Sequence, residues 1–167
     1  MHKALAAVLL VCLCSLGCRT PDWVQRPPTE PGYMYGVGSW SKTYYANQRE
    51  KAEEEARAAV GRTIHSHVNE LVLRVQTRYG AATVERLRRV ASSITDAHLE
   101  GCEPVAVWTD ERGRVGPAGT MYALARIRRT DAARAIQKAA GAPLATEEQE
   151  ALDQILQQME TNPGAAE

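Results

Sequence analysis

The sequence predicts an α+β fold, in which a small three-stranded, mostly antiparallel sheet packs against one long helix, with further short helices. Three observations support this class. Residues 33–40 alternate large and small side chains as a strand does, residues 43–78 carry one apolar stripe at helical spacing, and residues 99–109 and 120–128 form two further strand-like segments. With 167 residues, one hydrophobic core is the expected organisation.

The composition argues against some classes of function. Basic and acidic residues number 20 each, so the chain has no net field that would attract nucleic acid or a strongly acidic substrate. Phenylalanine is absent, and the large rings are three tryptophans and six tyrosines. Small and branched aliphatic residues therefore supply most of the interior, which favours close packing of helices.

The amino-terminal residues 1–17 have the order of a secretion signal. A short basic start that contains Lys3 is followed by an apolar stretch from Ala4 to Leu13 and then by small residues. The apolar stretch is shorter than the ~20 residues with which a helix crosses a bilayer, so a permanent transmembrane anchor is not expected. We expect export and cleavage of this segment.

The end of this segment, Ser15-Leu16-Gly17-Cys18, resembles the lipobox of bacterial lipoproteins, in which a cysteine receives diacylglycerol before the signal is cut. The resemblance implies cleavage between Gly17 and Cys18 and a lipid anchor on Cys18. Arg19 follows, where an Asp would favour the inner membrane, and this points to a periplasm-facing anchor in the outer membrane. The alternative is cleavage near Gly17 by the ordinary signal peptidase, which leaves a soluble periplasmic protein.

Residues 18–32 carry four prolines and are expected to form an extended leader after the lipidated cysteine. The strand at 33–40 contains Gly36 and Gly38. Two glycines alone are a weak sign of a phosphate-binding loop, because the third Gly and the Lys-Ser/Thr of such motifs are missing. Close packing of this strand on the long helix explains them more simply.

The long helix is expected over residues 43–78, which contain no proline. Glu53 with Arg57, and Glu70 with Arg74, have the spacing of helical ion pairs. The apolar stripe of this helix consists of Ala52, Ala56, Val60, Ile64, Val68, Leu71 and Val75. A second helical stripe follows and consists of Val84, Leu87, Ala91 and Ile94.

The two later strands, 99–109 and 120–128, are joined by a connector at 110–119. This connector contains three glycines and a proline and is longer than a tight hairpin needs. Alternation along 120–128 predicts one buried face and one partly solvated face.

Two helices are expected after the strands. The first is capped by Thr130 or Asp131 and runs through Ala140. The second is amphipathic and begins with Thr146 and Gln149 as a capping-box pair.

The mature chain also carries a series of short motifs: Pro21-Asp22-Trp23-Val24, Tyr35-Gly36-Val37-Gly38, Glu55-Ala56-Arg57, Val107-Trp108-Thr109-Asp110 and Tyr122-Ala123-Leu124-Ala125. In this order they resemble the LPP family of roughly twenty-kilodalton bacterial outer-membrane lipoproteins, whose domain also occurs in flagellar and envelope accessory proteins. The resemblance covers about residues 18–130 and implies an envelope-associated, non-enzymatic α+β domain.

These features divide the chain into four parts. They are a signal peptide at 1–17, the lipidated cysteine with its leader at 18–32, an α+β domain at 33–141, and a terminal helix with a loose tail at 142–167.

Candidate chemistry is sparse. Asp96, His98 and Cys102 contain an acid, an imidazole and a thiol, but nearness in sequence does not assemble a nucleophile, and a lone Cys usually packs as a small apolar residue. His65 and His67 are two positions apart on a helix, so their rings diverge and do not chelate one ion. The arginines Arg86, Arg88 and Arg89 could face lipid phosphate, although such a run is more often a solvated face. We expect no catalytic residue, metal or cofactor.

The leading hypothesis is therefore a membrane-tethered interaction or structural domain that meets an envelope protein partner and binds no nucleic acid. A periplasmic small-ligand-binding module, with the connector at 110–119 as a lid over a pocket, is the alternative. An enzyme that uses Cys102 comes third.

Overall fold

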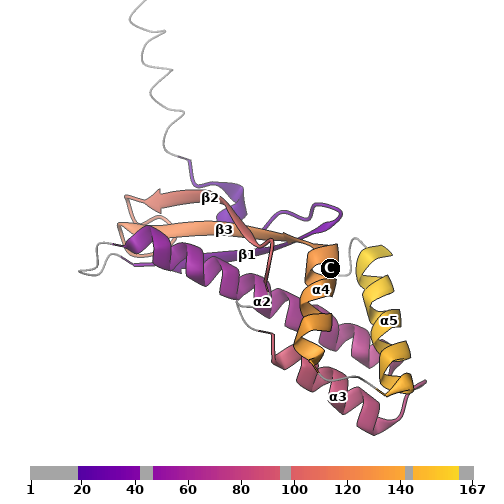
Figure 1. Ribbon diagram of the computed structural model, residues 1–167. Coiled ribbons are helices and arrows are strands. Elements are labelled where there is room, and N and C mark those ends of the chain that lie inside the picture. Colours follow the sequence, from indigo (N-terminus) through magenta and orange to yellow (C-terminus); the bar gives the residue numbers. More distant parts are fainter. Residues whose placement is uncertain (1–18, 42–46, 95–98, 142–144, 162–167) are drawn as a thin grey trace, which may run out of the picture.

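The computed structural model describes residues 19–41, 47–94, 99–141 and 145–161 (Figure 1). The elements are η2 (Asp22–Val24), β1 (Tyr33–Trp40), α2 (Gln48–Val75), α3 (Ala81–Ser92), β2 (Glu103–Asp110), β3 (Thr120–Arg128), α4 (Arg129–Ala140) and α5 (Thr146–Thr161). The strands form one antiparallel sheet in the order β1-β3-β2. The predicted α+β class, with a three-stranded sheet against a long helix, is confirmed.

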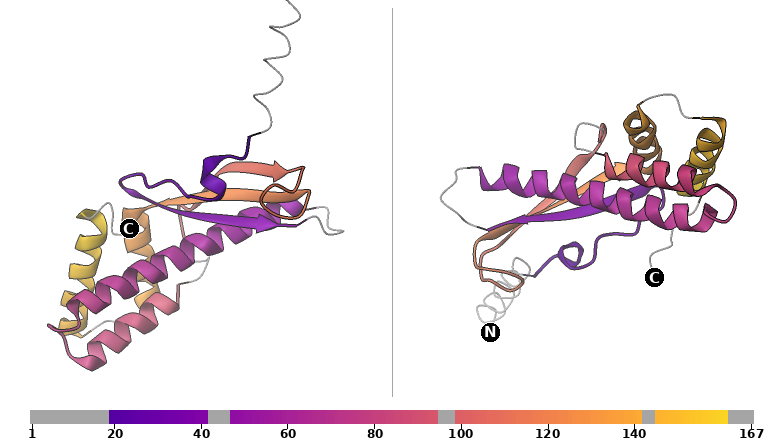
Figure 2. Two further views of the ribbon diagram at one scale, coloured as in Figure 1. Left: turned by 180° about the vertical axis from the view of Figure 1, so that it is seen from behind. Right: turned by 90° about the horizontal axis from the view of Figure 1, so that it is seen from below.

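Helix α2 extends beyond the sheet and joins two parts of the molecule. Its first half crosses one face of the sheet, and its second half packs with α3 and α5 beyond the sheet (Figures 1 and 2). The amino-terminal leader with η2 lies on the opposite face of the sheet (Figure 2). The sheet is thus covered by a helix on one side and by the leader on the other.

The contact between sheet and helix depends on Gly36 and Gly38. A Cβ atom on Gly36 would lie 2.4 Å from the backbone nitrogen of Val60, and one on Gly38 would lie 2.1 Å from that of Ala56. Both distances are far below van der Waals contact, so any larger residue would push the strand off the helix. The predicted close packing of strand and helix is confirmed.

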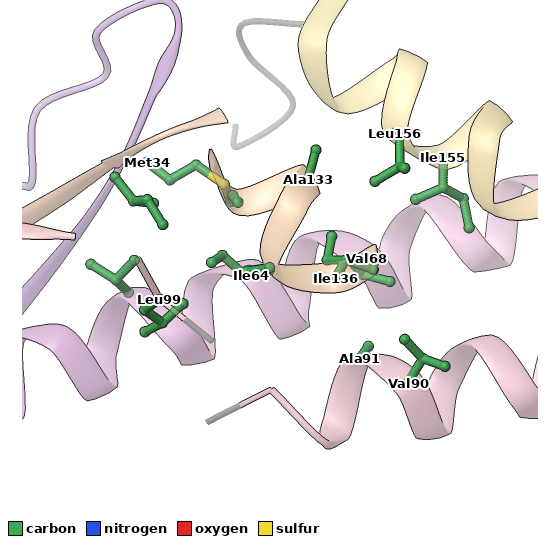
Figure 3. Close-up of a cluster of buried hydrophobic side chains, with 14 of the residues drawn as sticks. Met34, Ile64, Val68, Val90, Ala91, Leu99, Ala133, Ile136, Ile155 and Leu156 are labelled. Carbon is green, nitrogen blue, oxygen red and sulfur yellow. The ribbon is translucent and has the colours of Figure 1, made fainter. Parts of the chain in front are cut away.

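The hydrophobic core follows the predicted stripe of α2. From Ala52 to Leu71 the stripe residues are at most 1% exposed. Around the second half of α2, side chains from four helices converge, as Figure 3 shows for Val68 of α2, Val90 of α3, Ile136 of α4 and Ile155 of α5. Helix α5 therefore shares the core of the remaining chain.

Two predicted element starts are wrong. Strand β2 begins at Glu103 and not at residue 99, because Leu99 accepts a hydrogen bond from the backbone N–H of Cys102, at 3.1 Å, in a turn where Gly101 takes a φ of +83°. Helix α4 begins at Arg129, directly after β3, and no side chain caps it. Thr130 and Asp131, predicted as caps, therefore lie inside its first turn.

The capping pair predicted for α5 is also wrong. The helix begins at Thr146, and the carboxylate of Glu148 accepts a hydrogen bond from the backbone N–H of Ala145, at 3.0 Å. The side chain of Gln149 instead donates to Asp153 at 2.8 Å. The helix starts one residue earlier than a cap at Thr146 requires, so the contact between the N-cap N–H and the side chain three residues on shifts back by one position.

The predicted ion pairs of α2 are met in part. Arg74 donates to Glu70 at 2.7 Å, as expected from their spacing. Glu53 forms its ion pair with Arg49, at 2.8 Å, on the preceding turn.

Candidate functional site

The predicted lipidation residue Cys18 and its neighbour Gly17 lie outside the described residues. The described chain begins at Arg19, so the structure positions the segment that directly follows the proposed anchor. This segment connects the proposed lipid anchor on Cys18 to the folded domain.

The first part of the leader packs against the sheet, whereas residues 25–32 are exposed, so the expectation of an extended segment is wrong at residues 22–24. Asp22–Val24 form a turn of 3₁₀-helix, in which the N–H of Val24 donates to the carbonyl of Pro21 at 3.1 Å. This turn contacts β3 on the face opposite α2 (Figure 2). Prolines stiffen the leader but do not keep it extended, because Trp23 and Val24 gain from partial burial.

A small second apolar layer lies on this face of the sheet. Tyr35, Tyr122 and Leu124 are 8%, 9% and 4% exposed, and they lie outside the main core. The ring of Trp108 stacks on Tyr122 at a tilt, with 5.7 Å between centroids. The predicted partly solvated face of 120–128 is therefore solvated only toward its end, where Arg128 is exposed.

Polar contacts fasten the end of the leader to the sheet. The hydroxyl of Tyr35 donates to the carboxylate of Glu30 at 2.6 Å. Burial, and then the contact with Glu30, raise the pKa of Tyr35 above its ordinary value. The backbone N–H of Arg129 donates to the carbonyl of Gly32 at 2.9 Å, which ties the leader to the start of α4.

The connector at 110–119 is organised by Asp110, which is 1% exposed. Its carboxylate accepts hydrogen bonds from the backbone N–H groups of Arg114, Val115 and Gly116, at 2.8, 2.7 and 3.1 Å. Desolvation alone would raise the pKa of this carboxyl, but the backbone donors together outweigh it and hold the pKa below its ordinary value.

The role of Asp110 was missed in the sequence, although a signal was present. An aspartate at the end of a strand, followed by a glycine-containing stretch, is typical of a turn in which the side chain accepts backbone N–H groups.

Of the three residues of the candidate nucleophilic cluster, Cys102 lies within the described residues. Cys102 is partly exposed and packs at the edge of the main core. Asp96 and His98 lie outside the described residues. The structure therefore does not bring the three together or separate them.

The two histidines of α2 have different partners. The ring of His65 contacts the side-chain amide nitrogen of Asn69 at 2.9 Å, whereas Nδ1 of His67 lies 3.9 Å from the carboxylate of Glu70. Burial, and then the charge of Arg129, lower the pKa of His67. Within the four described ranges, no group of three or more His, Cys, Asp or Glu residues is arranged to hold a metal ion.

Three open depressions on the described part of the chain can be given with their lining residues. One of about 270 Å³ lies between α2 and α3 beside Arg62 and His65. Another, of about 410 Å³, lies between α4 and α5. A third, of about 470 Å³, lies where α2 turns into α3 and includes Arg88, while Arg86 and Arg89 lie partly or fully exposed on the same helix. Residues of the 110–119 connector line none of these three.

A three-stranded sheet, covered on one face by a long helix and on the other by the leader, defines a small α+β domain that begins almost at Cys18. The LPP20 lipoprotein family model matches residues 21–128, and the chain belongs to this family. The match extends from the leader to the end of β3, and α4 and α5 follow it. Comparison with curated proteins gives no match.

A search of the described residues for membrane-spanning helices finds no helix of sufficient length and apolar character.

Proposed function

We propose that this chain is a lipoprotein of the bacterial cell envelope, cut between Gly17 and Cys18 and held at the outer membrane by acyl chains on Cys18. It faces the periplasm and acts as a non-enzymatic interaction or structural domain, in the manner of an envelope or flagellar accessory, with an envelope protein as its partner. Membership of the LPP20 lipoprotein family carries this proposal. The signal-like residues 1–17 and the cysteine that follows them support it.

The absence of catalytic activity is part of the same proposal. The described side chains with catalytic potential contact residues of their own helix or the core: His65 contacts Asn69, His67 lies near Glu70, and Cys102 packs at the core edge. A nucleophilic site needs an acid, a base and a nucleophile that face one another.

The ligand-binding alternative has less support. It used the connector at 110–119 as a lid, but Asp110 ties that connector down through three backbone hydrogen bonds. A lid needs loop residues that can move over a pocket. The three depressions described above are lined by other elements.

Metabolic labelling with radioactive palmitate tests the anchor. Wild type should incorporate label and sediment with membranes, and Cys18→Ala should lose both properties. Cys102→Ser is the matched control, because it removes the other cysteine of the mature chain and should keep the label. An unlabelled wild type would contradict the proposal and would favour the soluble periplasmic alternative. Where wild type is labelled, crosslinking in the native envelope identifies the protein partner.

A further inference from the structure

We propose that the connector between β2 and β3 is a second membrane contact, in which Val115, together with the exposed Arg112 and Arg114 that precede it, docks on the anionic phospholipid surface that holds the acylated Cys18. This inference rests on the proposed function, because it takes the lipid anchor as given. It commits to one occupant, a phospholipid bilayer surface with negatively charged headgroups.

The tether between Cys18 and the packed part of the leader is short. Only Arg19 and Thr20 stand between Cys18 and Pro21, where the packed leader begins. The Cα atoms of Cys18 and Pro21 can therefore be at most roughly 10 Å apart, whereas a fully extended leader up to Tyr33 would span roughly 50 Å. The body is held against the bilayer, so one of its surfaces must face the lipid.

The place where the described chain begins selects that surface. The first described residues lie on the outer side of the sheet, toward the end that carries the β2–β3 connector, and all three views agree in this (Figures 1 and 2). Helices α3, α4 and α5 lie at the other end of the molecule. An anchor on Cys18 thus brings the connector to the membrane and leaves the helical end away from it.

The side chains of the connector fit a lipid surface. Val115 is 37% exposed and is one of three large exposed hydrophobic residues in the described chain, with Val105 on β2 and Leu73 on α2. Arg112 and Arg114 precede it in the connector and are both exposed. An apolar side chain close to two arginines can enter the headgroup region while guanidinium groups bind phosphate.

The backbone fixes this presentation. Asp110 binds the N–H groups of Arg114, Val115 and Gly116 on the inside of the loop, so the side chains of Arg114 and Val115 are left exposed on the outside. These donors stabilise the charge of the Asp110 carboxylate on the inside of the loop, and Glu111 is the exposed acidic residue beside the two arginines. The loop needs no rearrangement to meet a flat surface, and this lowers the cost of binding.

A fluorescence-quenching experiment tests the proposal. The mature, acylated chain with Cys102→Ser is labelled with a polarity-sensitive dye at Val115→Cys and reconstituted in phosphatidylethanolamine vesicles that contain phosphatidylglycerol and shallow spin-labelled lipids. We expect a blue-shifted emission and at least threefold stronger quenching than for the matched control Leu73→Cys, which is exposed on α2. Arg112→Glu with Arg114→Glu should reduce the quenching at position 115 at least twofold.

Equal quenching at positions 115 and 73, in a protein that floats with the vesicles, would overturn the membrane contact and leave the anchor intact. A chain that is not acylated and does not float would overturn both. Protection of position 115 in native envelope fractions but not in pure lipid vesicles would overturn the lipid contact in favour of a protein partner.

Discussion

At Gly38 the backbones of β1 and α2 approach so closely that a methyl group has no room. A Cβ atom there would lie within 2.6 Å of three backbone atoms of residues 52–56, none of which can rotate away. We expect Gly38→Ala to lower the free energy of unfolding by roughly 2–4 kcal/mol, since overpacking against backbone forces the strand to shift. Urea denaturation measures this change.

Gly61→Ala is the matched control. Gly61 lies on α2, the helix that Gly38 contacts, and only a side-chain atom of Leu99 lies near its Cβ position, at 3.7 Å. It should be neutral or stabilising by up to about 1 kcal/mol, as alanine favours helix. Equal destabilisation by both variants would contradict the account of the glycines.

Asp110 gives a pH-dependent prediction. Because its folded pKa lies below the ordinary value of 3.8, its carboxylate stabilises the fold fully above about pH 4, and this stability is lost as the pH falls through the folded pKa. Asp110→Asn places an amide NH₂ against backbone donors, so it should lower the melting temperature by several degrees at pH 7.

The difference between wild type and Asp110→Asn should shrink on acidification below pH 4. Thermal unfolding followed by circular dichroism across pH 2–7 measures it, with the exposed Glu111→Gln as control. A difference that stays constant over that range would show that the charge of Asp110 has no part in the effect.

The residues differ in how far the sequence reveals them. The role of Gly36 and Gly38 could be predicted, because two glycines in a strand next to an alanine-rich helix indicate close packing of the two backbones. Asp110 could not be assigned with the same ease, since its partners are the N–H groups of a connector whose path depends on φ and ψ angles that the composition does not specify.

Among the elements, the leader differs most from expectation. Its prolines predicted an extended spacer, but whether a proline-rich segment packs depends on the apolar surface offered elsewhere. Here that surface is the outer face of β3, where Tyr122 and Leu124 are buried. The start of α4 was missed for a related reason, because its first turn follows β3 without a capping side chain.

Tyr35→Phe tests how the leader is held. The variant keeps the ring but loses the hydrogen bond to Glu30, which is worth about 1 kcal/mol, or roughly fivefold in opening equilibrium. Amide hydrogen exchange at Val24 and Arg26, whose N–H groups form the 3₁₀ turn, should accelerate by about that factor while α2 is unaffected. Tyr33→Phe is the control, and similar acceleration in both variants would argue against the Glu30 contact.

Helix α5 is held to the other helices by buried side chains. Ile155 is fully buried against the other helices, so Ile155→Ala should cost about 2–4 kcal/mol, with one cooperative transition. Glu150→Ala, on the exposed side of the same helix, should change stability little. A separate early transition in Ile155→Ala, detected by comparing circular dichroism with tryptophan fluorescence, would mean that α5 unfolds on its own.

For the whole molecule, the proposed function depends on where the protein is attached and not on a catalytic site. The α+β class and the order of the strands and helices along the chain followed from hydrophobic periodicity, because each long stripe must bury one face. The proposed orientation on the membrane did not, since it depends on the leader packing on the outer face of the sheet. Under the proposed anchor on Cys18, a short tether and an exposed connector would give the folded body one defined membrane side.

Mass spectrometry of the mature protein extracted from native membranes tests the central claim most directly. The account predicts a chain that starts at Cys18, carries diacylglycerol on the sulfur of that cysteine and lacks residues 1–17. A chain that starts at Met1, or that begins at any residue without an attached fatty acid, would contradict it.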